Sequence, residues 1–233
     1  MCGILGISTT HSFSRADFEQ SLNTIRHRGP DGHGILFNEV KNIAIGHRRL
    51  AIIDLSEKGN QPMVSNDDRY RITYNGEIYN FKEIRDTLIK DGYRFNSNTD
   101  TEVVMNSFIE WGPECLKLFN GMFSFCIWDT KTDEFFIARD RIGIKPLFFY
   151  HDEKTFIFSS EIKAILEFNF IDKAVDQTAI YDFFTYLYIP SPKTIYKKIK
   201  KLEHGHYLLY SSKSKKLKKY KYWELNPYNS IDI

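Results

Sequence analysis

Apolar residues recur along the chain in two spacings, which mark two kinds of element. Short runs rich in β-branched and aromatic residues, bounded by Gly, Asn, Asp or Pro, are typical of strands. Antiparallel pairing is expected between most of these runs, because they follow one another closely along the chain. Strands are therefore predicted at 3–8, 35–37, 43–46, 50–53, 70–74, 122–129, 134–139, 147–150, 155–159, 207–210 and 219–224.

Other segments repeat apolar residues every third or fourth position, as amphipathic helices do. Phe18, Leu22 and Ile25 predict a helix over 14–27, with Ser14 accepting hydrogen bonds from the first free backbone N–H groups. Asn80 is expected to cap the next helix in the same way. Further helices are predicted at 81–90, 101–111, 160–167 and 176–187, with an extra turn or two in 113–119.

The order of these elements indicates the fold class. Strands mostly neighbour strands, helices arrive in pairs, and no period of 20 to 50 residues repeats, which excludes solenoids and propellers. A parallel doubly wound sheet would instead alternate strand and helix. We therefore expect an α+β fold, with stacked antiparallel sheets covered by helices. The hairpin 122–139 is expected to be extended by 147–150 and 155–159, and 207–210 to pair with 219–224.

Composition narrows the class of protein without naming a function. Hydrophobic residues make up 42% and charged residues 27% of the 233 positions, which excludes a disordered chain, a collagen and a coiled coil. Aromatic residues reach 15%, in keeping with sheet layers that pack flat rings. The net charge of +2 by itself implies no polyanionic partner.

The chain carries no sequence signal for a membrane or for export. The uncharged run 118–128 is too short to span a bilayer, which requires about 20 apolar residues. The first residues lack the basic start of a signal peptide, and three cysteines are too few and uneven for a disulfide scaffold. A cytoplasmic protein is expected.

Cys2 is the residue of greatest chemical interest. Removal of Met1 would leave one residue with both a thiol and a free α-amine, and an amine with a pKa near 8 can accept the thiol proton at neutral pH. The alternative is that Cys2 is an ordinary residue near a frayed terminus. Cys115 and Cys126 fit helix and strand interiors, where cysteine behaves as a small hydrophobic residue.

Several segments elsewhere have recognisable sequences and follow one another in a recognisable order. They are 26–32 (RHRGPDG), 46–54 (GHRRLAIID), 74–80 (YNGEIYN), 98–102 (NTDTE), 121–125 (GMFSF), 139–147 (RDRIGIKPL) and 159–164 (SSEIKA). Together with Cys2-Gly3-Ile4 they resemble class II glutamine amidotransferase domains, the cysteine branch of the N-terminal nucleophile hydrolases. Within that class the sequences of these segments most resemble those of the asparagine synthetases (glutamine-hydrolysing).

The resemblance implies a fold and a division of the chain. It runs from Cys2 to about Trp223, so 2–223 is expected to form the amidotransferase domain, a four-layer αββα sandwich. Residues 224–233 are expected to form a linker toward a synthetase domain outside this chain.

The resemblance also implies a reaction and its reactive groups. Cys2 would attack the side-chain carboxamide of glutamine and form a thioester, with its own α-amine as the base. The Asn75 side chain and the Gly76 N–H would form the oxyanion hole. A different reading of Asn75-Gly76 is a hairpin turn, for which Asn-Gly is the strongest short signal. Against the turn, 77–80 leads into a predicted helix.

The remaining site residues would hold the rest of the glutamine. Arg49 would bind the α-carboxylate, Asp100 the α-ammonium, and Glu77 would support the amine end. Other expected lining positions are Leu50, Ala51, Ile52 and Ile53. Without the resemblance, Arg49 is a solvated arginine and Asp100 a first-turn residue that stabilises the helix dipole. Arg48 is expected to be solvated, while 28–31 is expected to shape a loop near the site.

No metal site and no cofactor are expected in this chain. His27, His33 and His47 lack the spacings of zinc ligands. Neither the Ser-Gly-Gly-x-Asp-Ser phosphate loop of the synthetases nor a G-x-x-x-x-G-K-[ST] loop occurs, so ATP and Mg are expected only in the missing synthetase domain.

The expected partners are L-glutamine, a C-terminal synthetase domain and a second copy in a homodimer. Ammonia would pass to the synthetase domain, where aspartate is the expected acceptor. A different carboxylate, such as a sugar acid, is the alternative.

Two rival functions come from other features. Residues 193–221 hold eleven Lys and one Glu, a charge of +10, and with interleaved tyrosines they could bind nucleic acid or an anionic membrane. A solvated hairpin whose lysines protect an edge strand is the favoured reading, so nucleic acid is an unlikely partner. The second rival is a catalytically silent scaffold that retains Met1.

Overall fold

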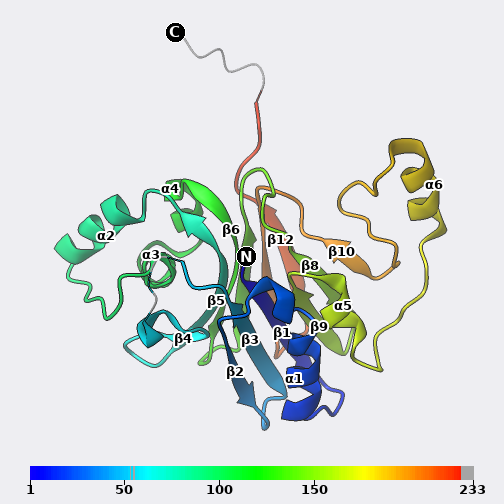
Figure 1. Cartoon of the computed structure of the whole chain (residues 1–233), viewed down its shortest axis with the longest axis horizontal. Coiled ribbons are helices and arrows are strands. Elements are labelled where there is room, and N and C mark those ends of the chain that lie inside the picture. Colours follow the sequence, from blue (N-terminus) through cyan, green and yellow to red (C-terminus); the bar gives the residue numbers. More distant parts are fainter. Residues whose placement is uncertain (53, 55, 227–233) are drawn as a thin grey trace.

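Two antiparallel sheets lie face to face in the computed structural model, which describes residues 1–52, 54 and 56–226 (Figure 1). In the described residues each sheet has six strands. The first has the order β10-β8-β9-β1-β3-β2, with β1 (Gly3–Thr9), β2 (Gly32–Asn38), β3 (Ile43–Arg49), β8 (Phe148–His151), β9 (Thr155–Ser159) and β10 (Ile199–Lys201). The second has the order β12-β11-β7-β6-β5-β4, with β4 (Met63–Val64), β5 (Tyr70–Ile78), β6 (Gly121–Asp129), β7 (Glu134–Arg139), β11 (His206–Ser211) and β12 (Leu217–Lys221).

Helices cover the outer face of each sheet. The first sheet is covered by α1 (Arg15–Asn23) and α5 (Ile162–Leu166), and the second by α2 (Phe81–Lys90) and α3 (Asp100–Trp111) (Figure 1). Short helical turns connect these elements: η1 (Arg26–Arg28), η2 (Glu57–Gly59), η3 (Gly112–Glu114) and α4 (Cys115–Leu118). Helix α6 (Gln177–Tyr186) projects from the body of the molecule.

Three apolar layers separate the four structural layers. The middle layer lies between the sheets and contains Ile4, Ile45 and Ile137. One outer layer joins Leu5 of β1 to Phe18 of α1, and the other joins β5 and β6 to α2 and α3. Ile4 and Leu5 point to opposite layers because successive strand residues face opposite sides of a sheet. The expected four-layer αββα sandwich and the α+β class are confirmed.

Many local predictions are confirmed. Ser14 caps α1, accepting a hydrogen bond from the Asp17 N–H while the Asp17 carboxylate accepts one from the Ser14 N–H. Helix α2 and strand β9 have the predicted bounds, and α3 ends at Gly112, whose φ of 55° suits glycine. Strands β11 and β12 pair as expected, although β12 ends at Lys221.

Other local predictions are wrong. No strand forms over 50–52, because the chain leaves the sheet after Arg49. Ile53, the last residue of that predicted strand, lies outside the described residues. The helix predicted over 14–27 ends at Asn23 and is followed by the separate turn η1. Asn80 makes no side-chain cap, since its amide bonds Leu118 and Asn120 instead.

The sequence predicted that β8 and β9 extend the sheet of β6 and β7, and this prediction is wrong. Their hairpin joins the first sheet, where β9 pairs with β1. In the part of the chain that the structure describes, no helix combines the length and the apolar content needed to cross a membrane.

Candidate functional site

Cys2 lies at the mouth of a cavity between the two sheets. It directly precedes β1, which is held between β3 and β9 in the middle of the first sheet. The Leu50 N–H lies 3.4 Å from the Cys2 Sγ, and Sγ in turn lies 3.6 Å from the Leu50 carbonyl oxygen. The cavity has a volume of about 230 Å³.

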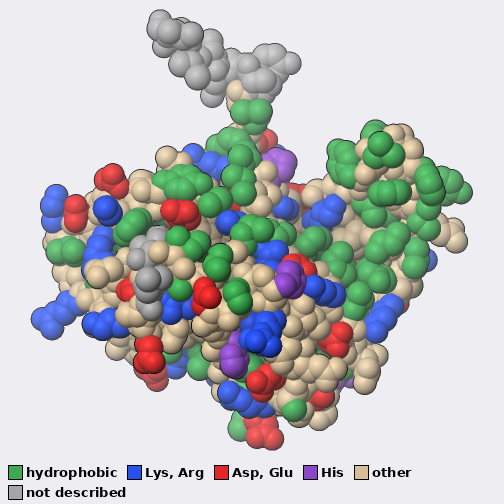
Figure 2. Space-filling model, in the orientation of Figure 1, with side chains coloured by type: hydrophobic (Ala, Val, Ile, Leu, Met, Phe, Trp, Pro, Cys, Tyr) green, Lys and Arg blue, Asp and Glu red, His purple; other side chains and the backbone are tan. Residues whose placement is uncertain are grey.

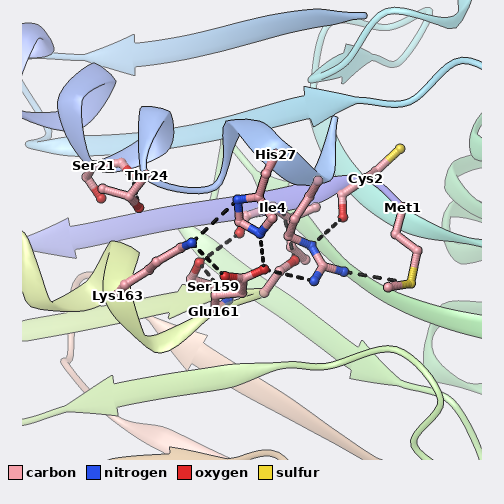
Figure 3. A network of polar contacts seen from close by, with 11 residues as sticks. Met1, Cys2, Ile4, Ser21, Thr24, His27, Ser159, Glu161 and Lys163 are labelled. Carbon is pink, nitrogen blue, oxygen red and sulfur yellow. Dashed lines mark hydrogen bonds and ion pairs between the residues drawn. The ribbon is translucent and has the colours of Figure 1, made fainter. Parts of the chain in front are cut away.

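A network of charged groups fixes the backbone at Cys2 (Figure 3). Arg28 Nε donates to the Cys2 carbonyl oxygen at 3.0 Å, and Arg28 Nη1 donates to Glu161 at 3.0 Å. His27 and Lys163 also bind Glu161, at 2.8 and 3.2 Å. Segment 28–31, which was expected to shape a loop near the site, therefore anchors Cys2 through Arg28.

Asn75 and Gly76 lie inside β5 and not at a hairpin turn, since β5 continues to Ile78 and pairs with β6 along this whole stretch. Asn75 is 1% exposed, and its Nδ2 has no hydrogen-bond partner in the described part of the chain. A Cβ on Gly76 would lie 2.5 Å from the Met122 carbonyl oxygen, so only glycine fits there. Both residues line the cavity with Cys2. A buried N–H donor without a partner is costly unless a ligand accepts from it.

Asp100 lies in another part of the cavity, at the first residue of α3. Its Oδ2 accepts hydrogen bonds from the Tyr74 hydroxyl at 2.6 Å and from the Ile78 N–H at 3.0 Å. Burial raises the pKa of Asp100, and these two hydrogen bonds act in the opposite direction. The half-buried Glu77 lines the same cavity, so two carboxylates are available to a cationic group.

Arg49 also lines the cavity, but its guanidinium is partly engaged. Nη1 donates to the Ser56 carbonyl at 2.9 Å and to Asn60 Oδ1 at 2.8 Å, and Nη2 donates to the Asp54 carbonyl. A guanidinium has five N–H donors. Within the described residues two of them, on Nε and Nη2, are left for a carboxylate.

The cavity thus brings together nearly all of the predicted site residues. Cys2, Arg49, Asn75, Gly76, Glu77 and Asp100 line it, and so do Leu50, Ala51 and Ile52. Ile53 lies outside the described residues. The roles assigned to these residues stay predictions.

Sequence reasoning missed several residues of the same cavity. Tyr74 and His47 connect the two sheets there, with His47 Nε2 donating to the Tyr74 carbonyl at 3.0 Å. Gln61 accepts from the Tyr74 N–H at 2.6 Å and donates to Thr101. Lys145 is a further lining residue. Tyr74 lies in the recognised segment 74–80 and Lys145 in the recognised segment 139–147. Their place in these segments was the one sequence signal that could have identified them as site residues.

The charge state of Cys2 reflects burial and nearby cations. Burial raises the pKa of the Cys2 thiol, while the Leu50 N–H and the positive charges of Met1, Arg49 and Lys145 lower it. Burial lowers the pKa of the Met1 α-amine, and the charges of Arg28 and Lys145 lower it further. Both shifts depend on side chains that come from distant parts of the sequence.

One expectation outside the cavity is wrong. Arg48, expected to be solvated, is only 6% exposed, because it packs under α1 and donates to the Leu22 carbonyl at 3.4 Å. Across the described residues, no cluster of three or more His, Cys, Asp or Glu side chains could hold a metal ion.

Some lysines of the lysine-rich segment form ion pairs within the chain. Lys193, Lys219 and Lys221 form ion pairs with Asp182, Glu203 and Glu224, at 2.7, 2.5 and 2.6 Å. Lys198 pairs with Asp172 at 3.2 Å. Strands β11 and β12 of this segment form a hairpin at the edge of the second sheet.

Comparison with known proteins places this geometry in context. A family model described as a glutamine amidotransferase domain matches residues 1–223. The chain is 42% identical to a putative asparagine synthetase [glutamine-hydrolyzing] 2 of Methanocaldococcus jannaschii, over 99% of this chain and 48% of that protein. It is 36% identical to asparagine synthetase [glutamine-hydrolyzing] 3 of Bacillus subtilis, over 100% of this chain and 38% of that protein. The chain thus spans less than half the length of these relatives.

Solved structures share the fold. The glutamine phosphoribosylpyrophosphate amidotransferase of Bacillus subtilis superposes with a TM-score of 0.68 at 20% identity, over 95% of this chain and 49% of that one. A structure described as the allosteric regulatory enzyme of purine biosynthesis gives a TM-score of 0.70 with the same identity and coverage. At this identity the likeness concerns the fold alone.

Proposed function

Because the chain belongs to the glutamine amidotransferase domain family, we propose that Cys2 is its nucleophile and that the cavity beside it binds L-glutamine. The observation that carries the proposal is the unpartnered Nδ2 of Asn75, buried in the wall of the cavity that Cys2 also lines. An amide donor held in this way is suited to an oxygen that gains negative charge during reaction.

The reaction proceeds in two steps. The Cys2 thiol gives its proton to the α-amine and Sγ bonds to the side-chain carbonyl carbon of glutamine, so that the oxygen becomes an oxyanion facing Asn75 and Gly76. The C–N bond then breaks, ammonia leaves with the proton from the amine, and a thioester remains. Water attacks the thioester, which releases glutamate and restores the thiol.

Substrate selection depends on the groups that bind the amino acid end. Asp100, with its second oxygen free of the hydrogen bonds to Tyr74 and Ile78, pairs with the α-ammonium. Arg49 offers its two remaining N–H donors to the α-carboxylate, and Glu77 supports the amine end. Leu50, Ala51 and Ile52 complete the wall. These groups favour free glutamine over glutamine within a peptide.

The base requires that Met1 be removed. In the chain as described, Met1 lines the cavity and its amine is one residue away from the thiol. Removal of Met1 transfers the free amine to Cys2 and opens the cavity further.

The ammonia acceptor is proposed from the longer relatives. We propose that the domain serves a synthetase that amidates aspartate to asparagine, with ATP and Mg bound outside this chain. In support, two relatives are named asparagine synthetases and are longer than the part that matches this chain. A different carboxylate, such as a sugar acid, is the alternative acceptor. No cofactor is proposed within this chain.

We further propose a cytoplasmic location, supported by three cysteines that are all free in the structure. A homodimer stays a prediction, which sedimentation of the purified chain would check.

The proposed function is tested by intact-mass spectrometry before and after exposure to 6-diazo-5-oxonorleucine, a glutamine analogue that alkylates nucleophiles. We expect a Met-free chain that gains one adduct, with labelling blocked by glutamine and absent in Cys2→Ala. A Met-free chain that hydrolyses no glutamine and never labels would contradict the proposal.

A further inference from the structure

Lys145 is a buried cation in the wall of the proposed glutamine cavity. Its side chain lines the cavity with Cys2, Gly76 and Met122, and the residue is 6% exposed. Among the described residues its ammonium has no hydrogen-bond or ion-pair partner. A lysine in such a place loses solvation without a compensating contact, and burial lowers the pKa of Lys145 accordingly.

The loop that carries Lys145 is rigid. The fully buried carboxylate of Asp140 accepts four backbone N–H groups, from Phe123, Ile142, Ile144 and Lys145, at 2.9 to 3.2 Å. Arg139 donates to the carbonyls of Lys145 and Gly143, each at 2.8 Å, and to that of Leu202 at 2.5 Å. The backbone of Lys145 is thus held at both its N–H and its carbonyl, which restricts where the ammonium can lie.

The other cations facing Cys2 are already engaged. Arg28 binds Glu161 and the Cys2 carbonyl, and Arg49 binds the segment that follows β3. The Asp31 carboxylate accepts the Ala51 N–H at 2.9 Å. Two negative groups act on Lys145, Glu77 on β5 and Asp140. The Asp140 carboxylate already accepts hydrogen bonds from backbone N–H groups of the loop. Lys145 is therefore the cation whose charge is least committed elsewhere.

We propose that Lys145 acts through Cys2: its ammonium stabilises the anionic sulfur and disfavours a second positive charge on the neighbouring α-amine. This inference rests on the proposed function and adds a residue to it. The amine serves as a base only when it is neutral, and the thiol attacks as the anion. One fixed cation favours both of these forms, so Lys145 extends the working range of the site to lower pH.

The direction agrees with the charges on either side. The positive charge of Lys145 lowers the pKa of the Cys2 thiol and of the terminal α-amine. Loss of the charge raises both, so the acidic limb of the pH–rate profile moves to higher pH. A single charge across a partly buried site changes a pKa by about half a unit to one unit.

The test compares three variants of the processed chain. Lys145→Met removes the charge and keeps an unbranched side chain, and Lys145→Arg keeps the charge. Lys154→Met removes the same charge from an exposed turn between β8 and β9 and serves as the matched control. The pH dependence of kcat/KM for glutamine hydrolysis is measured from pH 5.5 to pH 9.5.

We expect the midpoint of the acidic limb in Lys145→Met to rise by about half a unit to one unit. The rate then falls about three- to tenfold below the midpoint and recovers at high pH. Lys145→Arg and Lys154→Met keep the wild-type midpoint. A Lys145→Met profile with the wild-type midpoint, or one lowered equally at every pH, overturns the proposal, because a purely structural role lowers the rate without moving the midpoint.

A second measurement separates this proposal from the proposed function. Alkylation by iodoacetamide as a function of pH reports the thiol pKa of Cys2 alone, since Cys115 and Cys126 are fully buried. If the wild type hydrolyses no glutamine, the proposed function fails, yet a higher thiol pKa in Lys145→Met still supports the electrostatic role. An unchanged thiol pKa in an active enzyme contradicts that role alone.

Discussion

His47 is a fully buried imidazole that joins the two sheets beside the site. Its Nε2 donates to the Tyr74 carbonyl, whereas Nδ1 has no partner in the described residues, an arrangement that fits the neutral ring. Burial lowers the pKa of His47 to about 3, far below the ordinary value of 6.5. Because the folded state disfavours the charged ring, the neutral ring contributes its full stability above pH 6.5, and this contribution is lost as the pH falls toward 3.

We predict that this one residue reduces the free energy of unfolding by about 2 kcal/mol between pH 6.5 and pH 5, since each unit of pKa difference corresponds to about 1.4 kcal/mol. Urea denaturation at pH 6.5, 5.75 and 5 measures the slope. His47→Gln, which keeps an amide donor for Tyr74 but does not titrate, should show a slope smaller by that amount. Equal slopes in the two proteins would contradict the prediction.

At the proposed oxyanion position, Asn75→Ala should lower kcat for glutamine hydrolysis about 100- to 1000-fold, with a much smaller change in KM, because the proposed donor acts on charge that develops only during reaction. Steady-state kinetics measure both constants. Asn106→Ala is the matched control: Asn106 is also buried with an unpartnered Nδ2, but it lies on α3 outside the cavity wall. A similar loss in both variants would argue for general destabilisation.

The sequence predicted the residues that line the cavity where they stand next to one another in one recognisable segment. Asn75, Gly76 and Glu77 are consecutive in one strand, so a single segment contains all three. Lys145 was missed because its relation to Cys2 exists only after distant segments have folded together. Tyr74 was missed for a similar reason, since its hydroxyl reaches Asp100 at the start of another element.

Among the elements, local chemistry decided which predictions held. Ser14 and Asp17 are three residues apart, so the start of α1 could be read directly. The apolar run 50–53 has the composition of a strand, but Leu50 turns its backbone toward Cys2, and Ala51 donates to Asp31. The partner sheet of β8 and β9 also could not be read from their sequence, because it depends on pairing with β1.

Helix α6 presents an unusual element, with aromatic side chains facing outward (Figure 2). Of its ten residues only Ala179 is buried, and Phe184 is 76% exposed. The helix is nevertheless anchored by the ion pair between Asp182 and Lys193 and by hydrogen bonds that flank it. Its position is fixed while its apolar face contacts no other described element closely enough to bury it.

We predict that Phe184→Ser changes the free energy of unfolding by less than about 0.5 kcal/mol, as exposed substitutions usually do. Phe18→Ser, on the fully buried face of α1, should cost at least about 3 kcal/mol because it removes a core ring. Urea denaturation of both variants gives the comparison. A large loss in Phe184→Ser would show that α6 is packed in the isolated chain.

For the whole molecule, the important feature is that the site spans both sheets. Cys2 directly precedes β1 and Arg49 ends β3 of the first sheet, Asn75 and Glu77 belong to the second sheet, and Asp100 belongs to a helix outside the second. Hydrogen bonds join the sheets at this place, from Thr73 to the Gly46 carbonyl and from His47 to Tyr74. The geometry of the cavity therefore depends on the packing of the complete sandwich.

Ligand binding should accordingly stabilise the global fold. In Cys2→Ala, which binds glutamine without consuming it, glutamine at 100 times its Kd should raise the free energy of unfolding by about 2.7 kcal/mol. Thermal or urea denaturation with and without glutamine measures the increase. At the same glutamine concentration Cys2→Ala/Asp100→Asn should gain much less, because the ammonium loses its partner. An equal gain would indicate that glutamine binds elsewhere.

The central position of β1 has a consequence for the order of events during synthesis. Although β1 is made first, its neighbour β9 ends at Ser159, so the strand stays uncovered on that side until more than half of the chain exists. At usual ribosomal speeds this interval is about 10 to 30 seconds. The terminus is therefore accessible to a processing aminopeptidase before its pocket closes around it. On the proposed mechanism, Met1 can thus be removed before β9 pairs with β1 beside Cys2.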